Sequence, residues 1–263
     1  MSMHPIFQVD SFTQEPFAGN PAAVCLLATM ADEGWMQNVA AEMNLSETAF
    51  VAPMNDGRFH LRWFTPEAEV DLCGHATLAA AHVLFETKGT SQPLVFSTLS
   101  GELIARLHGS EIELDFPRID SMLGEPDTLI VEALGVPVTT FATTRLDYLV
   151  QTDLAETVRE CNPDFAQLKN LGVRGVILTA QSDRPQYDFI SRFFAPGVGI
   201  NEDPVTGSAH CALIPFWTPR LQKSELIGFQ ASKRGGIVRG HLQDRRVHLY
   251  GNAVTVLSGK LSC

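Results

Sequence analysis

The stretch "LRWFTPEAEVDLCGHATLAAAHVLF" (residues 61–85) joins a strand pattern, an acidic loop and a helix pattern. The first part alternates apolar and polar residues and ends in Phe64-Thr65-Pro66. From Gly74 the sequence is rich in alanine and leucine and apolar almost all round, up to Gly89. Because a helix without a wide polar face is a buried one, the stretch predicts a central helix over 74–89 that follows a strand.

A second stretch, "SRFFAPGVGINEDPVTGSAHCALIPF" (191–216), repeats these features in the same order. A strand ends in Phe194-Ala195-Pro196, an acidic loop follows, and Gly207 opens a small-residue helix. An ordered repeat of this kind indicates an internal duplication. We therefore predict two similar α+β domains, 1–120 and 121–263, with a cleft between them and with the last strand returning to the first domain.

The remaining chain predicts strands that alternate with a few helices. Helical spacing occurs at 31–44, 127–134 and 163–170, and the apolar segment from 207 to 217 begins a further helix. Strand patterns are more numerous, and they occur at 4–12, 19–27, 47–53, 58–66, 94–117, 139–152, 174–181, 187–196 and throughout the last 40 or so residues.

Composition excludes several classes of protein. A net charge of −11 over 263 residues argues against nucleic-acid binding, and the densest basic cluster, 233–246, is interrupted by glycines and apolar residues. No apolar run reaches membrane-span length, and the N-terminus lacks a signal-peptide pattern. The five cysteines are an odd number without a CxxC pair, which predicts reduced thiols and a cytoplasmic location.

The two helix starts are candidate binding sites for an anion. The first N–H groups of a helix have no partner within the helix, and a glycine lets a ligand approach the backbone. If the two halves are pseudo-symmetric, Gly74 and Gly207 both bind one negatively charged substrate. A plain turn at each glycine is an equally good interpretation, and we expect the side chain of Thr206 or Ser208 to serve as an N-cap.

Three ionisable residues are candidates for catalysis. Glu47 stands between apolar Leu45 and Phe50, and an apolar setting raises a carboxyl pKa and suits proton transfer. His75 titrates near neutrality and follows Gly74, and Asp203 precedes Pro204 just before the second helix start. An exposed strand-edge glutamate and a turn-forming Asp-Pro pair are the simpler interpretations.

Cys73 has three possible roles: a catalytic thiol, a metal ligand with His75, or a small core residue. Two ligands without HExxH, CxxC or a carboxylate set do not make a metal site, so we predict none. The sequence also lacks GxGxxG, P-loop and GxSxG motifs, and nothing in it supports nucleotide binding or hydrolase chemistry.

Together, "NLSETAFV" (44–51), "RWFTPEAEVDLCGHATLAAAHVL" (62–84), "NEDPVTGSAH" (201–210) and the N-terminal segment from Phe7 to Leu27 resemble the PhzF-like family of phenazine-biosynthesis isomerases. The resemblance covers nearly the whole chain. It implies a diaminopimelate epimerase-like fold: two pseudo-symmetric domains, each a curved, barrel-like sheet around a central helix.

The resemblance also implies a function. Glu47 matches the family's acid/base, which moves a proton between two carbons, with His75 and Asp203 in support. Ser46, Gly74, Gly207 and Ser208 match positions that bind a small carboxylate substrate. In the best-known members this substrate is a dihydro-hydroxyanthranilate. Neither a cofactor nor a metal is expected, and a homodimer is.

Two alternatives stay open at this point. One is a one-cysteine epimerase or dehydratase of the same fold that uses Cys73. Symmetric two-thiol chemistry is disfavoured because Thr206 occupies the second position, and a threonine cannot act as a thiolate. The other is a non-catalytic binding protein, since fold does not imply function.

Overall fold

The computed structural model describes residues 3–262, which form two compact units. Unit 1 contains the chain up to Phe116 together with the segment from Tyr250 onward, and unit 2 contains Pro117–Leu249. The domain division at residue 120 stays a prediction. None of the helices in the described part of the chain is long and apolar enough to span a membrane.

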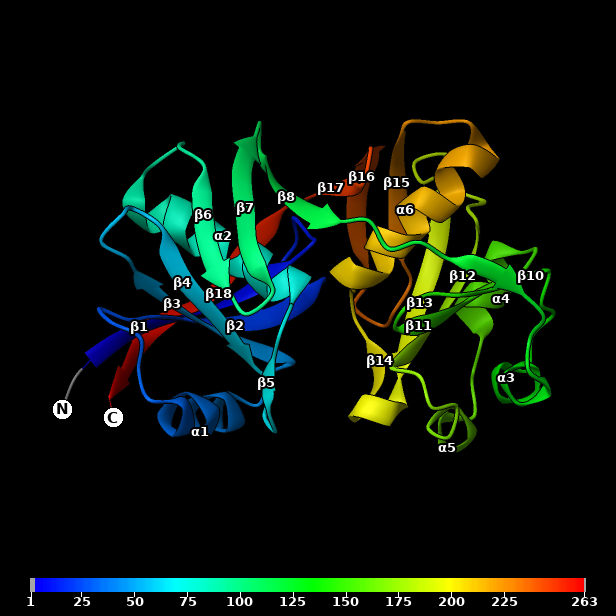
Figure 1. Cartoon of the computed structure of the whole chain (residues 1–263), viewed down its shortest axis with the longest axis horizontal. Coiled ribbons are helices and arrows are strands. Elements are labelled where there is room, and N and C mark those ends of the chain that lie inside the picture. Colours follow the sequence, from blue (N-terminus) through cyan, green and yellow to red (C-terminus); the bar gives the residue numbers. More distant parts are fainter. Residues whose placement is uncertain (1–2, 263) are drawn as a thin grey trace. The chain divides into compact units, whose positions relative to one another are not determined.

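Unit 1 is a curved sheet with two helices (Figure 1). Its strands follow the order β18-β1-β2-β3-β4-β6-β7-β8, and β5 pairs with the free end of β4. The bounds are β1 Met3–Ser11, β2 Asn20–Leu26, α1 Glu33–Met43, β3 Glu47–Pro53, β4 Phe59–Phe64, β5 Glu69–Val70, α2 Gly74–Lys88, β6 Leu94–Thr98, β7 Gly101–His108, β8 Glu111–Pro117 and β18 Ala253–Ser262.

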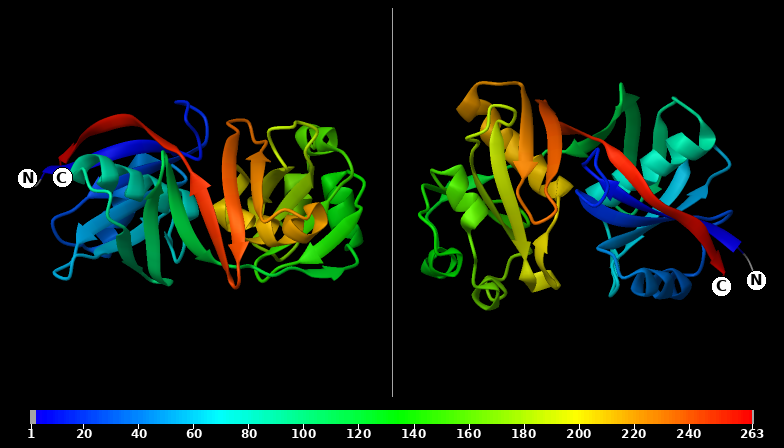
Figure 2. Two further views of the ribbon diagram at one scale, coloured as in Figure 1. Left: turned by 90° about the horizontal axis from the view of Figure 1, so that it is seen from above. Right: turned by 180° about the vertical axis from the view of Figure 1, so that it is seen from behind.

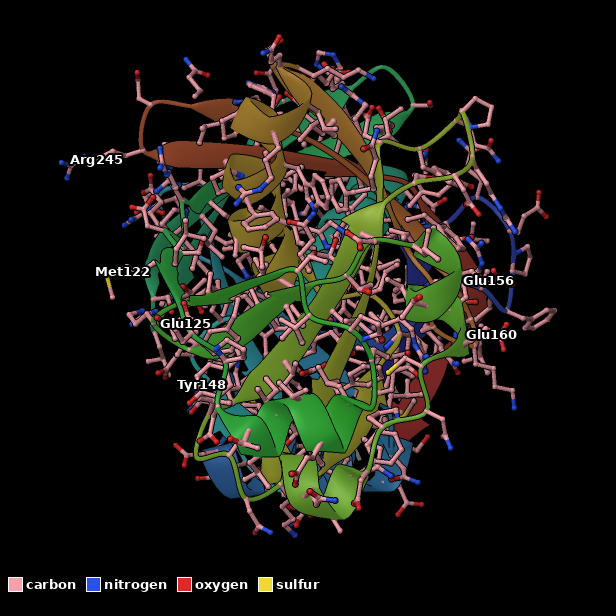
Figure 3. The ribbon with its side chains drawn as sticks, turned by 90° about the vertical axis from the view of Figure 1, so that its right-hand side faces the viewer. Met122, Glu125, Tyr148, Glu156, Glu160 and Arg245 are labelled. Atoms are coloured by element: carbon pink, nitrogen blue, oxygen red, sulfur yellow. The ribbon has the colours of Figure 1, made fainter. Side chains whose placement is uncertain are left out.

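Unit 2 contains a similar sheet with more peripheral helices. The bounds are β9 Met122–Gly124, α3 Thr128–Leu134, β10 Thr140–Thr143, β11 Asp147–Gln151, α4 Ala155–Glu160, α5 Phe165–Leu168, β12 Gly175–Gln181, β13 Phe189–Ala195, the 3₁₀ turn η1 Pro196–Val198, β14 Ile200–Asp203, α6 Gly207–Leu221, β15 Glu225–Gln230, β16 Gly236–Gln243 and β17 Arg246–Gly251. In Figure 3, the labelled residues Glu156 and Glu160 show where α4 lies in this unit, and the exposed side chain of Met122 projects outward from β9.

The predicted duplication is confirmed by the strand pairing. In unit 1, β2 and β3 are parallel, β4 is antiparallel to both β3 and β5, and β4 and β6 are parallel. In unit 2, β11, β12, β13, β14 and β15 repeat this scheme member by member. The central helices α2 and α6 follow β5 and β14, at the same point of each scheme.

One ion pair is duplicated as well. Arg62 of β4 forms a two-pronged pair with Glu69 of β5, and Arg192 of β13 does the same with Glu202 of β14. Each guanidinium also lies over a phenylalanine ring, Phe64 in one unit and the equivalent Phe194 in the other. The same ion pair therefore joins each acidic loop to the neighbouring strand of its sheet in both units.

The two central helices lie in the cores, as their apolar sequences predict. α2 packs against β1, β2, β3 and β18, and α6 packs against β15 and β16. α2 ends where Gly89 adopts a left-handed conformation with φ 58°. The helix predicted to begin in the segment 207–217 is α6, which runs to Leu221 although Pro215 and Pro219 lie within it.

The last strand belongs to unit 1. β18 pairs antiparallel with β1 from Met3 opposite Ser262 to Ser11 opposite Ala253. Figure 2 shows the two strands, blue and red, running side by side with both ends of the chain at the same edge. β1 therefore has a partner on each side, because β2 pairs with its other edge.

Candidate active site

In unit 1, Glu47 and His75 lie side by side. Glu47 is the first residue of β3, His75 is the second residue of α2, and Glu47 Oε2 is 3.1 Å from His75 Nε2. The two side chains are only 14% and 5% exposed. The two atoms are nevertheless not aligned for a hydrogen bond, and within residues 3–262 neither has another partner. Both atoms are therefore available to bond a ligand or a water molecule.

The other edge of the His75 ring is held by the protein. Nδ1 is 3.2 Å from Asn20 Nδ2 and 3.5 Å from Cys73 Sγ. Ser46 extends this network, because its hydroxyl donates to Asn20 Oδ1. The ring is thereby fixed on the Nδ1 side, and its Nε2 edge remains directed at Glu47.

Burial and neighbouring charges set the protonation of this group. Burial alone would lower the pKa of His75, but the adjacent Cys73 and Glu47 raise it well above its ordinary value. Burial raises the pKa of the Cys73 thiol, so this thiol is neutral at pH 7. Asn20 Nδ2 can only donate, so His75 Nδ1 accepts in that contact and the ring proton lies on Nε2, the edge that faces Glu47.

Glu47, Cys73 and His75 also bring three possible metal ligands within 4.8 Å of one another. Cys73 is adjacent to Nδ1 and Glu47 to Nε2. The lone pairs of these two ring nitrogens point in diverging directions, and a metal-bound imidazole uses one of them. With the ring in this orientation the three donors do not converge on a single ion.

The starts of the two central helices differ from those of α1, α3 and α5, although α4 also lacks a side-chain cap. Asp32, Asp127 and Asp164 cap α1, α3 and α5 with their carboxylates. The cap residues of α2 and α6, Cys73 and Thr206, make no such bond. The prediction that Thr206 or Ser208 caps α6 is therefore wrong, and the first N–H groups of both central helices are not covered by a side-chain cap.

Thr206 instead bonds to the loop before it. Its hydroxyl donates to the carboxylate of Asp203, and its backbone N–H donates to Gln230 Oε1 at 2.8 Å. Gln230 Nε2 in turn donates to the carbonyl oxygen of Asp203 at 2.8 Å. Gln230 is fully buried at the end of β15, so it fixes the position of Asp203 relative to the start of α6.

Ser208, the second residue of α6, is joined to a half-buried ion pair. Arg174 Nη2 donates to Ser208 Oγ at 3.0 Å. The same guanidinium donates to both carboxylate oxygens of Asp147, at 2.9 and 2.6 Å, and the Asp147 side chain is 2% exposed. A two-pronged arginine–carboxylate pair of this kind fixes the guanidinium plane.

The strand register shows which residues are equivalent in the two units. Thr48 pairs with Phe64 across β3 and β4, and Val176 pairs with Phe194 across β12 and β13. Glu47 of β3 is therefore equivalent to Gly175 of β12. A Cβ atom at Gly175 would lie 2.4 Å from the ring of Phe193, so no side chain fits there. Unit 2 has no counterpart of Glu47 at this position.

The predicted site residues thus form two groups. Ser46, Glu47, Gly74 and His75 lie together in unit 1, and Asp203, Gly207 and Ser208 lie together in unit 2. Sequence reasoning missed Asn20, Arg174 and Gln230, which support these groups from distant strands. Of these three residues, Asn20 alone has a signal in the sequence, because it stands in the Gly19-Asn20-Pro21 turn before a predicted strand.

The chain is similar to known proteins over nearly its whole length. The model of the phenazine biosynthesis-like protein family matches residues 9–259. An uncharacterized isomerase of Halalkalibacterium halodurans is 52% identical, over 99% of this chain and 99% of its own. The crystal structure of a PhzF-family phenazine biosynthesis protein of Enterococcus faecalis has a TM-score of 0.95 and 42% identity, and the match covers 100% of both chains.

More distant structures share the fold alone. A hydroxyproline epimerase of Agrobacterium vitis is 10% identical with a TM-score of 0.64, over 98% of this chain and 92% of that one. This likeness, together with the E. faecalis structure, confirms the prediction of an α+β, epimerase-like fold.

Proposed function

The chain belongs to the phenazine biosynthesis-like protein family and is an isomerase, and from this premise we propose that Glu47 is its only acid/base. The substrate is a small unsaturated carboxylate, and the reaction moves one proton between two of its carbons. No cofactor is needed in this proposal. The homodimer expected from the family stays a prediction.

The proposed reaction has two proton transfers. The Glu47 carboxylate takes a proton from an allylic C–H group, and the electron pair of that bond delocalises into the neighbouring double bond. The protonated Glu47 then returns the proton to the carbon at the far end of the resulting anion, and the double bond shifts by one position. Glu47 ends as the carboxylate, so the cycle closes without another reactant.

The anion must be stabilised while it exists. We propose that the substrate binds in a cleft formed by the two units, where the uncapped N–H groups of α2 and α6 and the hydroxyls of Ser46 and Ser208 receive its negative charge. His75 Nε2, 3.1 Å from Glu47 Oε2, is the candidate donor that orients this carboxylate. Asp203, held by Thr206 and Gln230, is the candidate partner for a donor group of the substrate.

One observation carries the proposal. Glu47 Oε2 and His75 Nε2 are buried neighbours without hydrogen-bond partners, whereas the equivalent position in unit 2 is a glycine that cannot carry a side chain. This asymmetry favours one base over the two-base chemistry of a symmetric racemase.

The test is the exchange of substrate C–H for deuterium in D₂O, followed by proton NMR with dihydro-hydroxyanthranilate and a panel of small unsaturated carboxylates. Glu47→Gln preserves the shape of the side chain but removes the base. We expect exchange to fall by about a hundred- to ten-thousand-fold, which is the usual contribution of a positioned acid/base.

Two further variants control this result. Glu47→Asp keeps a carboxyl group and should retain part of the exchange. Glu42→Gln removes an exposed carboxylate of α1 and should leave the rate unchanged. Undiminished exchange in Glu47→Gln would refute the proposal, and absence of both exchange and double-bond migration in the wild-type protein with every compound would favour the binding-protein alternative.

A further inference from the structure

We infer that Arg174 is a positioning residue for the substrate carboxylate, acting through the Ser208 hydroxyl at the start of α6. The inference rests on the proposed function, because it assigns the carboxylate to this helix start. It adds a residue that the sequence pattern "NLGVRGVIL" does not single out.

The hydrogen bond to Arg174 determines what Ser208 can do. A guanidinium has only donors, so Ser208 Oγ must accept in the 3.0 Å contact with Arg174 Nη2. The hydroxyl proton then needs an acceptor elsewhere, and no residue in the described part of the chain provides one. Arg174 therefore makes Ser208 a donor toward the helix start, where an incoming carboxylate would accept its proton.

The guanidinium is held firmly enough to have this effect. Asp147 binds it with both carboxylate oxygens, and the ring of Phe193 lies 5.4 Å from its central carbon. Arg174 also adds a positive charge beside N–H groups that have no side-chain cap. Both effects favour an anion at the same place.

The duplication gives an independent argument. Arg174 directly precedes β12, and Ser46 directly precedes β3, so the two residues are equivalent. Ser46 reaches His75, the second residue of α2, through Asn20, while Arg174 reaches Ser208, the second residue of α6, directly. In each unit a polar residue before the same strand orients the second side chain of the central helix.

Arg192 provides a matched control. It also forms a two-pronged ion pair, with Glu202, and it also lies over a ring, that of Phe194 at 4.8 Å. No contact joins Arg192 to the start of α6 among residues 3–262; its remaining bonds go to the carbonyl oxygens of Val158, Arg159 and Cys161. Its loss removes a similar structural interaction without affecting Ser208.

The experiment uses acetate as the minimal carboxylate. The ¹⁵N-labelled full chain is titrated with acetate against chloride at constant ionic strength, and the amide signals of Gly207 and Ser208 are followed. We expect a saturable shift in the wild-type protein and an acetate dissociation constant about tenfold higher in both Arg174→Ala and Ser208→Ala, the scale of one charge-assisted hydrogen bond.

The double variant and the control separate positioning from stability. Arg174→Ala combined with Ser208→Ala should bind acetate about as weakly as Ser208→Ala alone. Arg192→Ala should bind within about twofold of wild type. With a turnover substrate, Arg174→Ala should raise KM and change kcat little.

Three results would overturn the inference: additive effects in the double variant, equal weakening in Arg192→Ala, or no saturable shift at Gly207 and Ser208 in the wild-type protein. None of them bears on the deuterium-exchange test of Glu47, whose outcome decides the proposed function separately.

Discussion

At the scale of single residues, the environment of His75 separates two neighbouring candidates for chemistry. Its Nε2 edge meets Glu47 and its Nδ1 edge meets Cys73. The thiol is buried and its pKa is raised, so it is a poor base at neutral pH. Cys25, Cys161 and Cys211 are likewise buried, and Cys263 lies outside the described residues.

We predict that Cys73→Ala retains deuterium exchange within about threefold of the wild-type rate and loses about 1 kcal/mol of unfolding free energy, as is typical of a small core substitution. The small stability loss follows from the removal of one buried sulfur atom. Exchange by NMR and chemical denaturation followed by circular dichroism measure the two quantities.

Cys211→Ala is the control for a buried thiol away from Glu47. Loss of exchange in a folded Cys73→Ala protein, with Cys211→Ala active, would establish the one-cysteine epimerase or dehydratase alternative in place of the glutamate mechanism.

At the scale of elements, the two central helices combine an apolar body with an uncapped start. In each of these helices a side chain of the first turn also contacts the carbonyl oxygen of the cap residue. Thr77 Oγ1 donates to the carbonyl oxygen of Cys73, and His210 Nδ1 lies 2.9 Å from the carbonyl oxygen of Thr206. His210 is fully buried, and burial lowers its pKa to about 4.

We predict that His210 makes stability depend on pH. The unfolded chain binds a proton here below pH 6.5, but the folded chain does so only near pH 4. Unfolding therefore takes up a proton between these values, and the unfolding free energy should fall by about 3 kcal/mol as the pH drops from 6.5 to 4. Denaturant titrations at several pH values measure this slope.

His210→Asn keeps a donor for the Thr206 carbonyl oxygen but does not titrate in this range. This variant should remove the contribution of His210 to the pH dependence of the unfolding free energy. His60→Asn, at an exposed position, should leave that contribution in place. If the slope between pH 6.5 and 4 is identical in wild type and His210→Asn, the assigned cause is incorrect.

The elements also show what the sequence predicts and what it does not. The helix predicted at 74–89 is α2, because its apolar alanine- and leucine-rich run and Gly89 mark it, and the helix predicted at 127–134 is α3. The helix predicted at 163–170 is shorter in the structure, where α5 covers Phe165–Leu168, and the six-residue helix α4 is not predicted by the sequence. Glu47, His75 and Ser208 were visible as motif residues. Arg174 and Gln230 were not, because their contacts depend on strand register.

At the scale of the whole molecule, one pairing scheme is used twice with different side chains. The duplicated ion pairs, Arg62–Glu69 and Arg192–Glu202, keep the scheme intact in both units. At the equivalent positions before and at the start of β3 and β12, Ser46-Glu47 in one unit corresponds to Arg174-Gly175 in the other. The strand pairing is therefore the same in the two units, but the residues at these two positions differ.

We predict that deleting Ala253–Ser262 unfolds unit 1 preferentially. β1 would lose one of its two neighbours along its whole length, and the cost should approach the stability of a domain, about 5–15 kcal/mol. Trp63 reports on unit 1 and Trp217 on unit 2, so tryptophan fluorescence in variants that keep only one of them measures each unit.

We expect the fluorescence of Trp63 to show a lower denaturation midpoint, or a solvent-exposed tryptophan already without denaturant. The midpoint reported by Trp217 should change less. Equal shifts for both tryptophans would contradict the division of the chain into two separately cooperative units.

The glycine opposite the Phe193 ring has a stereochemical consequence. If Glu47 is the only acid/base, it lies on one side of the substrate, so the hydrogen leaves one carbon and arrives at the other on the same face. The rearrangement is then suprafacial. A substrate with deuterium at the diastereotopic position on that face transfers the label, and the diastereomer with deuterium at the other position does not. A missing side chain in unit 2 would in this way fix the handedness of the product.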